Sequence, residues 1–130
     1  MTILVAYAPR PEGRAALSKG IQMATQNNEK LVVVNASPGG AQKDESFADS
    51  RDAAWVQHEL HSSGLDTEFK QFVRGKDAVE EIVDLVEELS VSLLVIGLRR
   101  RSPVGKLILG STAQEILLTV DCPVLAVKAR

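Results

Sequence analysis

Leu93-Leu94-Val95-Ile96 is an uninterrupted aliphatic run that ends at Gly97, and it sets the architecture expected for this 130-residue chain. Such continuous runs are typical of parallel strands that helices cover on both faces. Two similar runs, Ile3 to Tyr7 and Leu31 to Val34, lie earlier in the chain. We therefore expect all three segments to be central strands of a parallel sheet.

Two further segments predict strands. Leu65 to Val73 alternates apolar and polar residues, which is typical of a strand that faces water on one side. We interpret it as an edge strand. Pro123 to Lys128 is a fifth short strand, and its first residue is a position where a strand tolerates the missing donor of proline.

Apolar residues spaced three and four apart between these runs predict four amphipathic helices. The first is expected from Pro11 to Asn27, and Asn27-Asn28 can end it in the left-handed conformation. The second helix is indicated by Ala53, Val56 and Leu60 and is expected to end at Gly64. The third is indicated by Val79, Ile82, Val83, Val86 and Leu89, and the fourth by Ala113, Ile116, Leu117 and Val120.

The alternation of strands and helices, with right-handed crossovers, predicts an α/β fold. We expect a single domain over residues 1–130, built as a doubly wound, Rossmann-like sheet of five parallel strands in the order 3-2-1-4-5 with four helices. The length suits one compact core.

Composition excludes several classes of protein. Fifteen Lys and Arg against seventeen Asp and Glu give a net charge of −2, which lacks the positive surplus of a general nucleic-acid binder. The N-terminus has no secretory signal pattern, and no apolar run approaches the length of a membrane span. The one cysteine, Cys122, excludes an internal disulfide framework. We expect a cytoplasmic protein with no nucleic-acid or membrane partner.

Residues 97–112 form the connection in which we expect the ligand site. In doubly wound sheets ligands bind at the carboxyl ends of the strands, where neighbouring crossovers diverge, which here means the turns after Tyr7 and Ile96. The connection holds three of the nine glycines and four of the fifteen positive residues, and it enters a helix at Gly110-Ser111-Thr112. Basic charge and a helix N-terminus favour a phosphate. Alternatively, Ser111 or Thr112 simply begins a capping box.

Three named phosphate motifs are absent. Gly105-Lys106 is followed by Leu107, so the connection is not a Walker A loop. The turn after the first strand has no dinucleotide fingerprint. Ala8 and Pro9 also lack the carboxylates of a phospho-receiver domain.

The chain has a family resemblance in two segments. These are Gly97 with Gly110 and Ser111, and the ending Cys122-Pro123-Val124-Leu125-Ala126-Val127. It resembles the universal stress protein family, whose signature is glycine, two residues, glycine, nine residues, glycine and Ser or Thr. The resemblance implies a fold of the adenine nucleotide alpha hydrolase type, an adenine nucleotide such as ATP, with or without Mg, and a homodimer. The dimer would form through the last strand, at Val124, Leu125, Ala126 and Val127.

The resemblance also implies site residues. Phosphates would lie against Gly97, Arg99, Arg100, Gly110, Ser111 and Thr112, and the nucleoside against Ala6, Tyr7, Ala8 and Ala36. The sequence departs from the family pattern at two positions. Ala8 replaces an aspartate that usually holds the nucleoside, and Arg100 replaces the middle glycine, where its guanidinium either fills the pocket or grips a phosphate.

Three functions follow from these residues. The first is a nucleotide-binding protein of stress response or signalling. The second is a dimeric interaction module without nucleotide, whose Arg99-Arg100-Arg101 binds an anion or an acidic partner, and the partner is unknown. The third is an enzyme, at most a slow ATP hydrolase, which comes last because Glu12 is the one carboxylate in the two turns and no catalytic residue is evident.

Other side chains that attract notice have simpler explanations. His58 and His61 lie three residues apart, but no third metal ligand is evident, so we interpret them as a solvated helix face. Cys122 is expected to be a small structural residue, and Trp55 a core or dimer contact. The acidic residues of the third helix are expected to be solvated: Glu80, Glu81, Asp84, Glu87 and Glu88.

Overall fold

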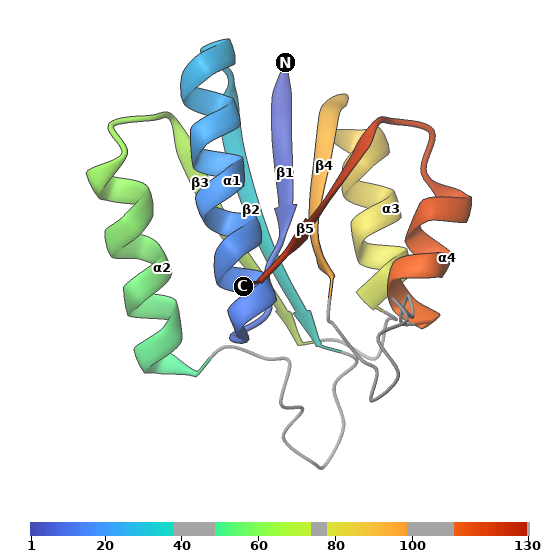
Figure 1. Cartoon of the computed structure of the whole chain (residues 1–130), viewed down its shortest axis with the longest axis horizontal. Coiled ribbons are helices and arrows are strands. Elements are labelled where there is room, and N and C mark those ends of the chain that lie inside the picture. The colour runs from blue at the N-terminus through green and yellow to red at the C-terminus, as the bar shows by residue number, and fades with distance from the viewer. Residues whose placement is uncertain (38–48, 74–77, 99–110, 130) are drawn as a thin grey trace.

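The computed structural model describes residues 1–37, 49–73, 78–98 and 111–129. Within these ranges strands and helices alternate along the chain (Figure 1). The strands are β1 (Thr2–Ala6), β2 (Lys30–Ser37), β3 (Thr67–Val73), β4 (Val91–Leu98) and β5 (Val124–Lys128). The helices are α1 (Pro11–Asn27), α2 (Ser50–Ser62), α3 (Ala78–Glu88) and α4 (Ser111–Thr119). No described helix is both long and apolar enough to cross a membrane.

The five strands form one parallel sheet in the order β3-β2-β1-β4-β5, which confirms the predicted topology. Helices α1 and α2 cover one face, and α3 and α4 cover the other (Figure 1). Alternate residues of β1 therefore enter two separate cores. Ile3 and Val5 pack with α1 and α2, whereas Leu4 packs with α3 and α4, and all three are fully buried.

The limits of α1 agree with the prediction because local chemistry defines both ends. Pro11 is the first helical residue, where its missing N–H is not needed, and Asn28 closes the helix in the left-handed conformation with φ of 53°. In the middle of the helix Gly20 lies directly on β1. A Cβ there would overlap Cγ2 of Val5, so the absent side chain allows the helix to approach the sheet closely.

Two expectations about exposure were wrong. Glu81, which we expected in solvent, is buried at 8% exposure, because the apolar face of α3 also includes Leu85, one helical turn further on. Leu117, which we expected in the buried stripe of α4, is 40% exposed. The helix is turned so that Ile116 faces the core, and Leu118, at 81% exposure, points into solvent.

The close contact between α1 and β1 predicts the effect of a methyl group at Gly20. We expect Gly20→Ala to lower the free energy of unfolding by about 1 to 2 kcal/mol, because overpacking a closed core outweighs the better helix propensity of alanine. Urea denaturation measures this change. In the double variant with Val5→Ala the loss should be smaller than the sum of the single losses.

Ser18→Ala, at an exposed position of the same helix, is the control and should change stability by less than about 0.5 kcal/mol. A Gly20→Ala protein more stable than the parent would contradict the packing described for this helix.

Candidate functional site

The candidate site lies at the carboxyl edge of the sheet, where β1 ends before its neighbours. The ladders of β1 stop at the pairs Ala6 with Val34 and Ala6 with Ile96, whereas β2 continues to Ser37 and β4 to Leu98. The crossover after β1 goes to one face of the sheet and the crossover after β4 goes to the other (Figure 1). The predicted switch point is therefore present, with a gap at the end of the central strand.

The structure brings several predicted site residues to this edge. Ala6 ends β1, and Tyr7 and Ala8 follow it. Gly97 lies near the end of β4, and Ser111 begins α4, followed by Thr112. The backbone of Ala36 lies at the same end of β2, in register with Phe72. The predicted phosphate residues Arg99, Arg100 and Gly110 lie outside the described residues.

Gly97 has a packing role that the sequence did not indicate. It follows Ile96, the last partner of β1, and it pairs with Val127 of β5. A Cβ on Gly97 would overlap the carbonyl oxygen of Glu12 and lie 2.6 Å from its carbonyl carbon. The glycine therefore lets the first turn of α1 rest directly on β4, with Glu12 in the space that a side chain of residue 97 would need.

Side-chain amides fasten the end of β1 to β2 and β3. The last backbone bond on this side runs from the Tyr7 N–H to the Val34 carbonyl at 2.8 Å. Beyond it, Nδ2 of the fully buried Asn35 donates to the Tyr7 carbonyl at 2.9 Å. Nε2 of Gln71 in turn donates to Oδ1 of Asn35 at 3.3 Å. This chain of bonds holds three strand ends together and satisfies a buried amide.

The turn after β1 carries no carboxylate at Ala8, the position at which the resemblance implies an aspartate. Ala8 is half-buried, and its carbonyl accepts a hydrogen bond from the Arg10 N–H at 2.7 Å. The next acidic residue, Glu12, already lies in the first turn of α1. The site therefore offers backbone groups and small side chains at this point.

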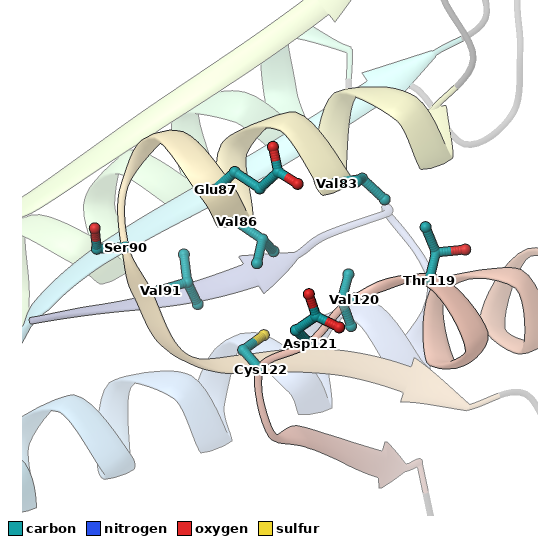
Figure 2. A pocket seen from close by; sticks show the side chains of 9 residues that line it. All are labelled: Val83, Val86, Glu87, Ser90, Val91, Thr119, Val120, Asp121 and Cys122. Atoms are coloured by element: carbon teal, nitrogen blue, oxygen red, sulfur yellow. The ribbon is translucent and has the colours of Figure 1, made fainter.

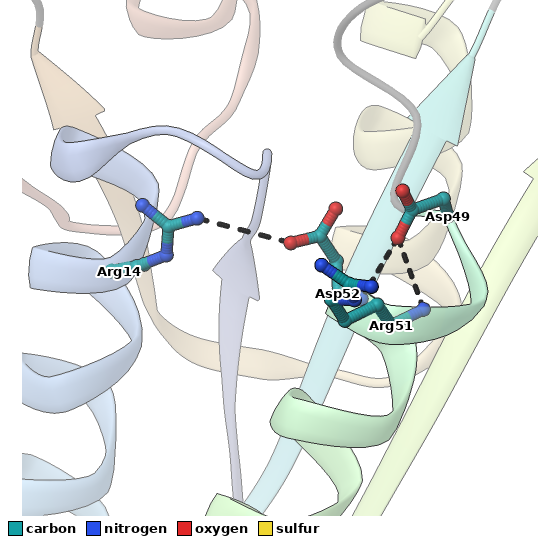
Figure 3. Close-up of polar contacts among 4 residues, drawn as sticks. All are labelled: Arg14, Asp49, Arg51 and Asp52. Atoms are coloured by element: carbon teal, nitrogen blue, oxygen red, sulfur yellow. Dashed lines mark hydrogen bonds and ion pairs between the residues drawn. The ribbon is translucent and has the colours of Figure 1, made fainter.

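A polar cluster of α1 and α2 side chains borders the site on one face of the sheet (Figure 3). Arg14 of α1 lies 3.8 Å from the Asp52 carboxylate of α2, and its guanidinium carbon is 6.0 Å from the centre of the Trp55 ring. Asp49 caps α2 by accepting from the Arg51 and Asp52 N–H groups, both at 3.0 Å. The backbone bond from Asp52 is the main cause that lowers the pKa of Asp49.

Tyr7, which follows β1, lies next to this cluster through its contact with Trp55. Its ring lies 6.3 Å from that of Trp55, and only 3% of the residue is exposed. Within the described part of the chain its hydroxyl is buried without a hydrogen-bond partner. Burial raises the pKa of Tyr7, and the positive charge of Arg14 opposes that shift. Sequence reasoning missed this cluster, because Arg14 and Asp52 resemble ordinary surface residues of two separate helices.

A pocket lies between α3 and α4, away from the candidate site (Figure 2). It has a volume of about 300 Å³ and lies where both helices end and β4 begins. Glu87 and Asp121 line it, and a negative lining does not suit a phosphate. Cys122 also lines it, and burial raises the pKa of its thiol, which agrees with a structural cysteine.

The described residues contain no group of three side chains able to hold a metal ion. His58 and His61 are both exposed on α2, as expected of a solvated face. Trp55 packs against the core of the α1 and α2 face, as one of its two predicted roles requires.

Comparison with known proteins gives consistent relatives. The universal stress protein family matches residues 1–128. A curated universal stress protein of Mycolicibacterium smegmatis is 46% identical over 126 residues, which cover 97% of this chain and 96% of the relative. A solved universal stress protein of Archaeoglobus fulgidus is 32% identical with a TM-score of 0.80, and each chain is 98% covered. Another from that organism, in complex with dAMP, is 28% identical with a TM-score of 0.73 and the same coverage.

The buried hydroxyl of Tyr7 predicts how stability depends on alkaline pH. The folded chain keeps the phenol proton at a pH where the unfolded chain, with a pKa of about 10, loses it. This contribution to stability is complete below pH ~10 and is lost as the pH rises through the higher folded pKa. Urea unfolding from pH 8 upward should therefore show a fall that Tyr7→Phe makes smaller, and the buried Cys122 thiol, whose pKa is also raised, accounts for part of the rest.

Tyr7 is the one tyrosine of the chain, so the ultraviolet absorbance of tyrosinate titrates this group alone. At neutral pH, Tyr7→Phe should be neutral or stabilising, because it removes a buried donor without a partner. A folded-state pKa at or below 10 would contradict the buried position of the hydroxyl.

Proposed function

Because the chain belongs to the universal stress protein family, we propose that it binds an adenine nucleotide at the carboxyl edge of the sheet, between the ends of β1 and β4. The observation that carries the proposal is the early end of β1, whose ladders stop at Ala6 while β2 and β4 continue to Ser37 and Leu98, and where Ala8 contributes only a methyl side chain. The dAMP complex of the Archaeoglobus fulgidus relative supports a ligand of this class.

In this proposal the phosphates lie at the N-terminus of α4. Free N–H groups and the helix dipole favour an anion there, and Ser111 and Thr112 begin the helix. Gly97, Arg99, Arg100 and Gly110 complete the phosphate contacts, and Ala6, Tyr7, Ala8 and Ala36 those of the nucleoside. The ligand is ATP or another adenine nucleotide, with or without Mg. Its binding alters the choice of partner in a stress or signalling response in the cytoplasm.

We further propose a homodimer through β5. This strand is the edge of the sheet, so one side of its backbone lacks a ladder partner within the described chain. Val124, Leu125 and Val127 are half-buried, and Ala126 is exposed. The exposed Leu117 and Leu118 lie on α4, the helix that precedes this strand, and a second copy would cover part of that apolar surface.

A second candidate function follows from Ala8. Without a carboxylate to hold the nucleoside, the site loses roughly 1.5 to 3 kcal/mol relative to one that forms a charged hydrogen bond. The alternative is therefore a dimeric interaction module without nucleotide, whose Arg99-Arg100-Arg101 binds an anion or an acidic partner.

Calorimetric titration with AMP, dAMP and ATP at fixed salt, the last with and without Mg, tests the proposed function. We expect dissociation constants in the micromolar range, and Ala8→Asp should tighten AMP binding roughly 10- to 100-fold by restoring a charged hydrogen bond to the nucleoside. Mass spectrometry of small molecules released from the purified protein provides an independent measurement.

Gln57→Glu, at an exposed position of α2, adds the same charge away from the site and should leave affinity unchanged within about twofold. No heat at millimolar nucleotide, for the parent and for Ala8→Asp alike, would refute nucleotide binding and favour the interaction module.

The dimer is tested by sedimentation velocity of the parent and of Ala126→Glu. We expect a dimer that the substitution dissociates at least tenfold more readily, because two like charges would face each other across the paired β5 strands. Gln57→Glu again serves as the control and should remain dimeric. A monomeric parent, or a dimer unaffected by Ala126→Glu, would rule out this interface.

A further inference from the structure

The backbone at the end of β1 presents a donor to the gap between β1 and β4. In a continued parallel ladder, the Tyr7 carbonyl would accept from a backbone N–H of β2. That ladder ends at Ala6 and Val34, and Nδ2 of Asn35 takes the role of the missing donor at 2.9 Å. A buried side chain thus fixes the direction of the carbonyl after the regular sheet has ended.

The direction of the Tyr7 carbonyl also fixes the next amide. The peptide from Tyr7 to Ala8 is trans, because no described peptide bond is cis, so its N–H points opposite to its C=O. The carbonyl points to β2, and β1 lies between β2 and β4. The Ala8 N–H therefore points toward β4.

No described strand residue accepts a hydrogen bond from this amide. The ladder between β1 and β4 ends at Ala6 and Ile96, one residue before the position at which Gly97 would begin to accept from Ala8. Gly13 of α1 packs against the Ala8 backbone from one side, and Ala8 is half-buried, so part of the residue remains exposed at the edge of the sheet. An amide held in a fixed direction without a strand partner is a prepared donor for an acceptor atom.

We propose that the Ala8 amide donates a hydrogen bond to an oxygen of the sugar-phosphate of the bound nucleotide, and that Asn35 is the positioning residue that directs it. The inference rests on the proposed function and deepens it. Nε2 of Gln71 on β3 donates to Oδ1 of Asn35 at 3.3 Å. Two strand side chains therefore orient the Tyr7 carbonyl and, through the same peptide, the Ala8 N–H. The Ala8 backbone N–H donates a hydrogen bond, whereas the carboxylate of an aspartate would accept one.

Nuclear magnetic resonance of the wild-type chain labelled with ¹⁵N-alanine tests the donor directly. At saturating AMP, the Ala8 amide proton should shift downfield and exchange with solvent at least tenfold more slowly. The Ala6 amide, inside the β1 ladders, is the internal control and should keep its exchange rate within about twofold. Adenosine distinguishes the two kinds of oxygen, because a response to adenosine assigns the sugar and a response to AMP alone assigns the phosphate.

Two variants test the positioning role. Asn35→Leu is similar in size and removes the donor to the Tyr7 carbonyl, so it should weaken AMP roughly 5- to 10-fold and abolish the slow exchange of Ala8 in the complex. Gln71→Leu removes the outer bond but keeps the Asn35 donor to the Tyr7 carbonyl, so it should change affinity less than threefold. If Asn35→Leu does not fold, the wild-type measurement still decides on the donor.

The outcomes separate this inference from the proposed function. AMP that binds by calorimetry while the Ala8 amide neither shifts nor gains protection overturns the inference alone. An Ala8 response that persists in folded Asn35→Leu overturns the positioning role. A failure of AMP to bind at all overturns the proposed function and the inference with it.

Discussion

The short central strand is the constraint on which the rest of this structure depends. β1 pairs on both sides, yet both of its ladders stop at Ala6, whereas β2 and β4 continue to Ser37 and Leu98. The carboxyl edge of a doubly wound sheet is where the crossovers diverge, and here the divergence coincides with a missing piece of strand. The early end of β1 at this edge therefore follows from strand length and connectivity.

Close packing and side-chain hydrogen bonds hold the strand ends at this edge, and each has a physical cause. Gly97 lets α1 begin directly on β4, because any Cβ there would overlap the Glu12 carbonyl. On the other side, Asn35 and Gln71 replace the backbone bonds that β1 no longer makes, which avoids unsatisfied polar groups in a buried position. Close packing on one side and amide bonds on the other leave few ways for the end of β1 to move.

The central strands and the limits of α1 could be predicted because they depend on short-range chemistry, whereas the strand order follows from right-handed crossovers in a doubly wound sheet. Aliphatic runs fixed the central strands, and Pro11 with Asn28 defined both ends of α1. The rotation of α4 could not be predicted, because Ile116, Leu117 and Leu118 are consecutive apolar residues and only the packed structure selects the one that faces the core. Glu81 was missed for a related reason, since charge alone predicts solvent.

The candidate site, too, could be predicted from the sequence only in part. The strand order predicted that the turns after β1 and β4 lie at one edge of the sheet, and the structure has them there. Arg99, Arg100 and Gly110 lie outside the described residues, and the ligand contacts of the other site residues stay a prediction. The role of Asn35 could not be seen in the sequence, because a polar residue after Val34 resembles the start of a loop. Its function requires the neighbour and register of β2, and these exist only once the sheet has formed.

Ala8, in place of the aspartate that the resemblance implies, changes what the end of β1 would demand of the proposed nucleotide. A carboxylate accepts, so it selects a hydroxyl or an amine and adds a negative charge close to the phosphates. The backbone amide, which either residue would carry, donates to oxygen acceptors, and alanine leaves it without a neighbouring carboxylate and its negative charge. A ribose hydroxyl satisfies either group, but a phosphate oxygen satisfies only the amide. Discrimination at this edge should therefore depend more on the phosphates than on the sugar hydroxyls, and the positive charge and helix N-terminus that follow β4 in the chain favour the same part of the nucleotide.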